Sequence, residues 1–307
     1  MKLHTILGAG GAVSNQLLPV LLKNNERVRL VSRRAQPLAN VEAVAADVTD
    51  YQQTLHAIKG SSVVYLLVGL TYDIKVWRES WPKNMTNVIN ACKETGSKLI
   101  FFDNVYMYGK VSGEMTEETP FNPNSKKGEV RARIANMILD EVAKGKLKAL
   151  IARAPDFYGP QTPLSFINVM LFENYAKGKK GQLMISDSYK HSLIYTPDAA
   201  KATAILGNTD AAFNQVWHLP TDKNVLTMKQ IADLSAAAFN MKPGYMILPK
   251  WMLRILSLFI APIKESLEML YQNDSDYLFD SSKFDKTFQF TTTTYAEGIK
   301  KTAASYK

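Results

Sequence analysis

Hydrophobic positions in the first half of the chain alternate between short apolar runs and longer segments with helical periodicity. Six apolar runs predict strands, at 3–7, 27–31, 41–48, 62–69, 99–102 and 147–151. The run at 62–69 is nearly continuous, which is typical of a parallel strand covered on both faces. Helix-length segments separate the strands, including a long one at about 77–95. This alternation predicts an α/β fold with a doubly wound, Rossmann-type parallel sheet.

A glycine-rich turn joins the first predicted strand to the helix that follows it. Gly8, Gly11 and Ser14 have the spacing of the short dinucleotide-binding fingerprint, with serine in place of the third glycine. Gly8 allows a tight reversal, and Gly10 and Gly11 allow a pyrophosphate to approach the backbone. The first helical turn presents unpaired N–H groups to such an anion. We therefore predict a dinucleotide site made by Gly8, Gly10, Gly11, Ala12, Val13 and Ser14.

The end of the second predicted strand indicates which dinucleotide binds. In this fold, residues at that position meet the adenosine ribose. A carboxylate there binds the 2′-hydroxyl of NAD, whereas a guanidinium binds a 2′-phosphate through bidentate, charge-assisted hydrogen bonds. Ser32 and Arg33 occupy the position here, so we predict NADP in preference to NAD. The alternative is that Arg33 and Arg34 only solvate the end of the strand.

Two further predicted strands end at candidate cofactor contacts. Asp47 and Val48 fall where such folds hold the adenine, with the carboxylate accepting from the exocyclic amine and the next backbone N–H donating to the ring. Asp50 fits better than Asp47 as the N-cap of the following helix. Val68 and Gly69, at the end of the fourth strand, complete this part of the predicted cofactor site.

Composition agrees with a globular protein that takes an anionic ligand. The 307 residues are enough for one large domain with a substantial subdomain. A net charge of +9 suits an anion, but the lysines are spread along the chain, so we expect no specific nucleic-acid partner. The single Cys92 excludes an internal disulfide, and the scattered histidines have no metal-ligand spacing. We therefore predict no metal site.

Motifs in the rest of the chain follow an ordered pattern. They are Val105–Gly109, Glu117–Pro120, Arg153–Pro160, His191–Ala200 and Phe279–Lys283. With the glycine turn and Asp47, they make the chain resemble the extended short-chain dehydrogenase/reductase family, in its NAD(P)-dependent epimerase/dehydratase group. The resemblance runs through nearly all of the sequence. It implies a dinucleotide-binding domain at 1–158, with returns from about 183–220, and a smaller C-terminal substrate lobe at 159–182 and 225–307.

The resemblance also implies where the catalytic residues would lie. The family uses a Tyr-x-x-x-Lys pair on the helix after the fifth strand, and a serine or threonine at the end of that strand. Its tyrosine donates or accepts the proton, and its lysine supports the tyrosine and binds the ribose. Lys127, Arg131 and Asn104 stand at these three positions. None of the three family residues is kept.

Two interpretations of this replacement stay open. In the first, Asn104 polarises a carbonyl oxygen and Lys127 delivers the proton, with Arg131 on the same helix face. Tyr106, which leaves the same strand end, is a second candidate proton donor, and Pro155 is expected beside the nicotinamide. In the second, Lys127 and Arg131 only hold the phosphate or ribose of the cofactor. The chain is then a non-catalytic, NADP-responsive regulator or scaffold on the same fold.

The activity that the resemblance implies is that of an NADP-binding oxidoreductase or epimerase/dehydratase. Its substrate would be a small carbonyl, hydroxyl or sugar compound, including a nucleotide sugar. Arginines that would clamp a nucleotide-sugar diphosphate are scarce in the substrate lobe, because Arg254 is the only one after Arg153. The resemblance further suggests a helix-paired homodimer.

An apolar segment at 251–262 is too short to span a bilayer, contains Arg254 and stops at Pro262. We predict a core helix there, with Met246 and Trp251 among the core residues, and a membrane-surface helix is the alternative. The N-terminal apolar run is broken by glycines and leads directly into the fold, so it does not predict a signal peptide. We therefore expect a cytoplasmic protein with no membrane span.

Overall fold

The computed structural model describes residues 2–306, which form two compact units. The first unit contains residues up to 107 together with 126–153 and 199–217, and the second contains 108–125, 154–198 and the residues from 218 onward. Each unit therefore combines segments that are far apart in the sequence.

The first unit is built on a single sheet. Its strands are β1 (Leu3–Leu7), β2 (Arg27–Ser32), β3 (Glu42–Ala45), β4 (Val63–Leu66), β5 (Lys98–Asp103), β7 (Ala149–Arg153) and β11 (Val216–His218). Their order in the sheet is β11-β7-β5-β4-β1-β2-β3, and neighbouring strands from β7 to β3 run parallel. This order confirms the predicted doubly wound parallel fold.

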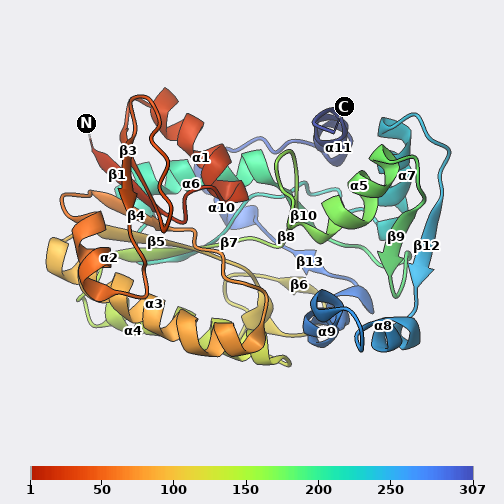
Figure 1. Ribbon diagram of the computed structural model, residues 1–307, viewed down its shortest axis with the longest axis horizontal. Coiled ribbons are helices and arrows are strands. Elements are labelled where there is room, and N and C mark those ends of the chain that lie inside the picture. The colour runs from red at the N-terminus through yellow and green to blue at the C-terminus, as the bar shows by residue number, and fades with distance from the viewer. Residues whose placement is uncertain (1, 307) are drawn as a thin grey trace. The chain divides into compact units, whose positions relative to one another are not determined.

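Helices cover both faces of this sheet. They are α1 (Ala12–Lys23), α2 (Tyr51–Ile58), α3 (Ile74–Thr95), α4 (Lys126–Ala143) and α6 (Thr196–Asn208), with the short 3₁₀ helices η1 (Tyr106–Tyr108) and η3 (Asp210–Ala212). Figure 1 shows α3 and α4 on one face and α1 and α6 on the other. Every residue of β1 and β4 is buried, because covered parallel strands have no solvent-facing side. The apolar runs of the sequence therefore become the core of this unit.

Element boundaries match the sequence expectations where a capping residue marks them. Asp50 caps α2, since its carboxylate accepts a hydrogen bond of 2.9 Å from the Gln53 N–H. The third strand is shorter than predicted and ends at Ala45, so Asp47 lies in the loop that follows. This strand is at the edge of the sheet and alternates between exposed and half-buried residues, which gives it a weaker pattern than a central strand.

The second unit contains short paired strands and small helices. They are β6 (Glu114–Met115), β8 (Asp156–Tyr158), η2 (Asn168–Phe172), α5 (Glu173–Ala176), β9 (Gly181–Met184), β10 (Leu193–Tyr195), α7 (Met228–Ala238), β12 (Tyr245–Leu248), α8 (Lys250–Leu256), α9 (Ala261–Ser266), η4 (Leu267–Asn273), β13 (Leu278–Phe279), α10 (Ser282–Phe288) and α11 (Tyr295–Ala304). The strands pair in parallel as β10-β8, β12-β9 and β13-β6. Aromatic side chains such as Tyr158, Phe172 and Tyr295 fill its main core.

The prediction of a core helix at 251–262 was wrong. α8 buries only Leu253, while Trp251 is 62% exposed and Phe259, just beyond the helix, is 83% exposed. Met246 on β12 is also exposed. The physical reason is that α8 has two turns and packs on a small cluster through Leu253 and Met252, so that Trp251 and Ile255 on its other side stay exposed. Within residues 2–306, no helix has the length and hydropathy needed to cross a membrane.

Candidate active site

The glycine turn after β1 requires glycine for two separate reasons. Gly8 has a φ of +107°, and Gly10 has a φ of +88°, both in the region that side chains disfavour. A Cβ at Gly8 would also lie 2.7 Å from the backbone of Leu67 and Val68, just beyond β4. The turn is held in place by two hydrogen bonds of 3.0 Å from the N–H groups of Gly8 and Ala9 to the Val31 carbonyl. The backbone here is therefore fixed before any ligand arrives.

The start of α1 leaves its N–H groups available to an anion. Gly11 is the N-cap residue, no side chain caps the helix, and its first turn contains no acidic residue. No atom lies within 4 Å of a Cβ built at Gly10, so the backbone is open to a ligand on that side. Ser14 is buried at 2% exposure, as close packing of helix on strand requires. These residues fit the pyrophosphate of a dinucleotide.

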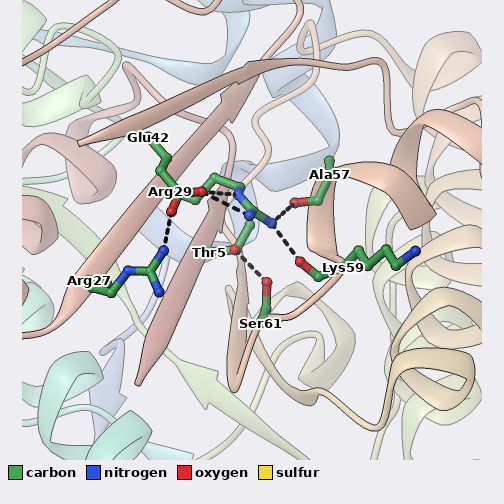
Figure 2. A network of polar contacts seen from close by, with 7 residues as sticks. All are labelled: Thr5, Arg27, Arg29, Glu42, Ala57, Lys59 and Ser61. Atoms are coloured by element: carbon green, nitrogen blue, oxygen red, sulfur yellow. Dashed lines mark hydrogen bonds and ion pairs between the residues drawn. The ribbon is translucent and has the colours of Figure 1, made fainter. Parts of the chain in front are cut away.

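Two of the arginines on β2 are engaged within the sheet, as Figure 2 shows. Arg27 Nη2 donates to Glu42 Oε1 at 2.7 Å, and Arg29 Nε donates to Glu42 Oε2 at 2.9 Å. Arg29 Nη1 also donates to the carbonyls of Ala57 and Lys59. Arg33, at the end of β2, is exposed and forms no ion pair within the described residues. The guanidinium that we predict to bind a 2′-phosphate therefore makes no direct ion pair with a carboxylate, although its charge acts on Asp47.

Asp47 lies in an ordered loop after β3. Its Oδ1 accepts a hydrogen bond of 2.9 Å from the Thr49 N–H, and this bond, with the charge of Arg33, lowers the pKa of the Asp47 carboxyl. The Asp47 N–H donates to Gln53 Oε1 at 2.9 Å, and the Val48 carbonyl accepts from Asn87 at 3.0 Å. The loop thus holds an ionised carboxylate near the end of β2.

The end of β5 carries a buried ion pair that the sequence reasoning missed. Arg131 Nη1 on α4 donates to Asp103 Oδ1 at 3.2 Å, and both side chains are buried. The Arg131 guanidinium lies over the rings of Trp77 and Trp81, at 4.7 and 4.3 Å from their centroids. Burial raises the pKa of Asp103, against the opposing charges of Arg131 and Arg153. Arg131 is therefore held inward by an acid and two rings.

Lys127, one turn before Arg131 on α4, is also buried, at 1% exposure. Its Nζ lies 4.6 Å from the centroid of the Tyr72 ring, in cation–π contact. Tyr106 stacks on Trp77 with ring centroids 6.4 Å apart. Asn104 Oδ1 accepts from the Tyr106 N–H at 3.0 Å, which leaves the Asn104 NH₂ group as a donor.

The structure brings the four predicted catalytic residues, Asn104, Tyr106, Lys127 and Arg131, to one aromatic cluster in the first unit. Its rings are Tyr72, Trp77 and Trp81, which sequence reasoning did not single out. The sequence reasoning did not predict a role for Asp103 either, although an acidic residue at the end of an apolar strand can be recognised in the sequence. Val68 lies beside Gly8, and Gly69 is exposed. Pro155 lies in the second unit, buried directly before β8.

The second unit has polar pairs of its own. His191 Nε2 lies 2.9 Å from Asp156 Oδ2, and the His191 ring stacks on Tyr277 with centroids 4.4 Å apart. His218 Nε2 lies 2.8 Å from the Tyr108 hydroxyl. Both pairs are able to share a proton. Among the described residues, no group of three His, Cys, Asp or Glu side chains is placed to hold a metal ion.

A model of the NAD dependent epimerase/dehydratase family matches residues 4–217. The chain belongs to this family, and the match covers all of the first unit except its first residues. Membership confirms the resemblance seen in the motifs and the interpretation of the chain as an enzyme of this type. The family is described as NAD dependent, which agrees with the prediction of a nicotinamide cofactor. The preference for NADP stays a prediction.

Solved structures with this fold match the whole chain at low identity. UDP-glucose 4-epimerase from Thermus thermophilus, in complex with NAD, is 16% identical with a TM-score of 0.80, and the match covers 100% of this chain and 99% of that one. A double mutant of DesIV, a dTDP-glucose 4,6-dehydratase from Streptomyces venezuelae, has the same identity and TM-score, with 100% and 97% covered. UDP-N-acetylglucosamine 4-epimerase from Bacillus cereus is 15% identical, with a TM-score of 0.79 and 99% and 96% covered. These likenesses show the fold.

A curated sequence relative matches only part of this chain. Protein y4nL of Sinorhizobium fredii (strain NBRC 101917 / NGR234), described as uncharacterized, is 27% identical over 135 residues. The match covers 44% of this chain and 37% of that protein, so it spans little more than a third of the relative's length.

Proposed function

We propose that this protein is an NADP-dependent epimerase, dehydratase or oxidoreductase that acts on a sugar or a related small hydroxyl or carbonyl compound. The observation that carries the proposal is the turn at Gly8–Gly11, which is shaped by close backbone contacts and opens onto an uncapped helix. The space beside Gly10 and the unpaired N–H groups at the start of α1 are not filled by the protein. A bound pyrophosphate fits this arrangement.

The cofactor would be held along the ends of β1, β2 and β4. The pyrophosphate would accept hydrogen bonds from the first turn of α1, and Asp47 and Val48 would meet the adenine. Arg33 supports the choice of NADP, because Arg27 and Arg29 are already bound to Glu42 while Arg33 is not. When bound, the nicotinamide supplies hydride transfer to or from a carbon of the substrate.

Proton handling would fall to the cluster at the end of β5. Lys127 stands at the position of the family's tyrosine and carries dissociable protons, whereas the Arg131 guanidinium is engaged by Asp103. We propose that Lys127 exchanges the proton of the reacting oxygen and that the Asn104 NH₂ group donates a hydrogen bond to it. Tyr106 is the second candidate donor. Arg131 would then act as a positioning residue.

The sugar part of the proposal comes from relatives of the same fold. The solved structures named above include two epimerases of UDP-sugars and a dehydratase of a dTDP-sugar. Arg254 is the only arginine of this chain after Arg153, so a diphosphate in the second unit would rely mainly on lysines. We therefore propose a sugar or sugar-like substrate and leave the nucleotide part as the finer question.

A second candidate function is favoured by one observation. Lys127 and Arg131 are both buried against aromatic rings, an arrangement that also suits a purely structural role. The protein would then be a regulator or scaffold that binds the nucleotide without turnover. Its affinity for a protein partner would depend on the bound cofactor.

The first experiment is calorimetric titration of the nucleotide-free protein with NADP⁺, NADPH, NAD⁺ and NADH at one salt concentration. We expect tighter binding of the phosphorylated pair. Arg33→Ala should weaken NADP⁺ by about tenfold or more and leave NAD⁺ nearly unchanged, because a charge-assisted contact to one phosphate is lost. Arg34→Ala is the matched control and should change neither. Equal losses for both nucleotides would contradict a 2′-phosphate contact, and no binding of any nucleotide would overturn the proposal.

Lys127→Met separates the two candidate functions once a substrate is found. The variant keeps an unbranched apolar stem of similar length but loses the ammonium that lies over the Tyr72 ring and has no proton to transfer. We expect turnover to be lost while the Kd for NADP⁺ changes by less than about threefold. Unchanged turnover would remove Lys127 from the mechanism. A wild-type protein that binds NADP⁺ but turns over none of a panel of sugars and carbonyl compounds would support the regulator.

A further inference from the structure

Five large apolar side chains are exposed on one short segment of the second unit. This segment, which we call the apolar tip, consists of Trp251 and Ile255 on α8 and Leu258, Phe259 and Ile260 in the turn after it. Their exposed fractions are 62%, 51%, 77%, 83% and 41% in that order. An exposed apolar surface of this density is unusual for a protein that meets only water, and it marks an interaction site.

The apolar tip is an ordered part of the fold. The N–H groups of Leu258 and Phe259 donate to the carbonyls of Ile255 and Leu256 at 3.1 and 3.0 Å, so the turn continues from α8. Leu253, on the opposite side of α8, is buried in a small cluster with Leu248 and Leu270. One side of α8 is therefore anchored, and the other presents Trp251 and Ile255 one turn apart.

The charged residues that flank the apolar tip in the sequence are basic as far as Lys264, and Glu265 is the first acid after it. Residues 234–264 contain no aspartate or glutamate, but they contain Lys242, Lys250, Arg254 and Lys264. All four are exposed, and none forms an ion pair within the described residues. We call these four cations the basic rim, because they precede, interrupt and follow the apolar segment in the sequence. Basic residues interspersed with apolar and aromatic ones are typical of segments that lie in the interface of an anionic membrane.

We propose that the apolar tip docks this protein on the surface of a membrane that contains anionic lipids. Trp251, Leu258 and Phe259 enter the interfacial layer, and the four cations of the rim contact lipid phosphates. The segment is too short to span a bilayer, so the association is peripheral. A second copy fits less well, because a symmetric contact between two apolar tips would bring the two basic rims against each other. The proposal is independent of the cofactor site.

The test is cosedimentation of the full chain with two kinds of vesicle, one of phosphatidylcholine alone and one of phosphatidylcholine mixed with phosphatidylglycerol. We expect binding to the mixed vesicles, little binding to phosphatidylcholine, and weaker binding at high salt. Trp251 supplies an optical signal, because Trp77, Trp81 and Trp217 are buried while Trp251 is not. Its emission should shift to shorter wavelength when the mixed vesicles are added.

Three variants identify the surface. The double variant Leu258→Ser, Phe259→Ser should lower vesicle affinity by at least about tenfold, since both side chains lose apolar contact. Lys250→Gln, Arg254→Gln should reduce the preference for phosphatidylglycerol, by about fivefold per cation, because two of the four cations are lost. Leu164→Ser is the matched control, because Leu164 is 95% exposed elsewhere in the same unit; it should bind like wild type.

Each other result overturns the proposal. These results are no binding to the mixed vesicles, equal loss in the Leu164→Ser control, or unchanged binding by the Leu258→Ser, Phe259→Ser variant. A dimer in light scattering that this variant abolishes, in a protein that does not bind vesicles, would assign the apolar tip to self-association. Far-ultraviolet circular dichroism and thermal unfolding check that each variant is folded.

Discussion

The glycine turn after β1 and the cluster at the end of β5 lie in the same unit and are built in opposite ways. The turn depends on the absence of side chains. Gly8 packs against the backbone just beyond β4, where a Cβ would clash, and no side chain caps the start of α1. The cluster works through large buried side chains, with Arg131 against Asp103, Trp77 and Trp81. The first is an opening for a ligand, whereas the second is filled by the protein itself.

This difference determines how each of the two places responds to substitution. A backbone site depends on conformations that few residues allow, so substitutions there are not tolerated. A side-chain site tolerates replacement when the new groups find partners. Here Arg131 has Asp103, and Lys127 has the Tyr72 ring.

The largest expected effect is at the glycine turn. Gly8→Ala places a Cβ 2.7 Å from the Leu67 and Val68 backbone and forces an unfavourable φ. We expect a loss of several kcal/mol in the free energy of unfolding and loss of detectable NADP⁺ binding. Urea unfolding and calorimetry measure the two effects.

Gly60→Ala is the control for that experiment. Gly60 has a φ of +78°, but no atom lies within 4 Å of its Cβ position. It should therefore lose only the backbone term, about 1–2 kcal/mol, with an unchanged Kd for NADP⁺. If Gly8→Ala lost no more stability and no more NADP⁺ affinity than Gly60→Ala, the close backbone contacts at Gly8 would not be needed for folding or for nucleotide binding.

The second-largest expected effect concerns the buried pair of Asp103 and Arg131. Asp103→Ala leaves the Arg131 guanidinium buried without its carboxylate, which should cost about 3–5 kcal/mol in the free energy of unfolding. Adding Arg131→Met should restore part of that loss, because the guanidinium that donates a hydrogen bond to Asp103 is then removed together with the carboxylate. Urea unfolding of the two single variants and the double variant gives the coupling. Additive losses would mean that the two residues act independently.

The third effect concerns a buried group that is neutral rather than charged. Burial lowers the pKa of His4 on β1 to about 4, from an ordinary value of 6.5. Between these values the unfolded chain binds a proton that the folded chain does not, so stability falls as the pH drops from 6.5 to 4. The loss amounts to about 3 kcal/mol.

His4→Gln isolates this contribution, since glutamine is also able to bond the Tyr65 hydroxyl that His4 Nδ1 contacts at 2.9 Å. Urea unfolding at pH 7 and at pH 4.5 should show a smaller pH dependence for His4→Gln than for wild type. The same dependence in both proteins would assign the acid sensitivity to the carboxylates.

Much of the first unit was predictable from the sequence because its signals are local. Continuous apolar runs predicted β1 and β4, Asp50 predicted the start of α2, and the glycine spacing predicted the turn. The edge strand β3 was predicted too long, because a half-buried strand has a weak pattern.

The features that the sequence did not predict depend on tertiary contacts between residues from different elements. The positions of Lys127 and Arg131 followed from the motif order, but their partners did not: Asp103 and Trp77 come from other elements. The sequence wrongly predicted that the apolar tip is part of the core. Hydrophobicity along a chain does not show whether another element packs on the apolar residues. Trp251 has no such neighbour.

The pairing of Arg131 with Asp103 also constrains how this protein can evolve. Arg131 lies over two indole rings and donates a hydrogen bond to a buried acid, and a lysine has no planar group to lie over those rings. A lysine at position 131 would therefore keep a cation beside Asp103 but lose the plane that lies over the two rings. An uncharged residue there would remove the cation that hydrogen-bonds the buried Asp103 carboxyl, so position 131 is constrained by the rings and by the acid together.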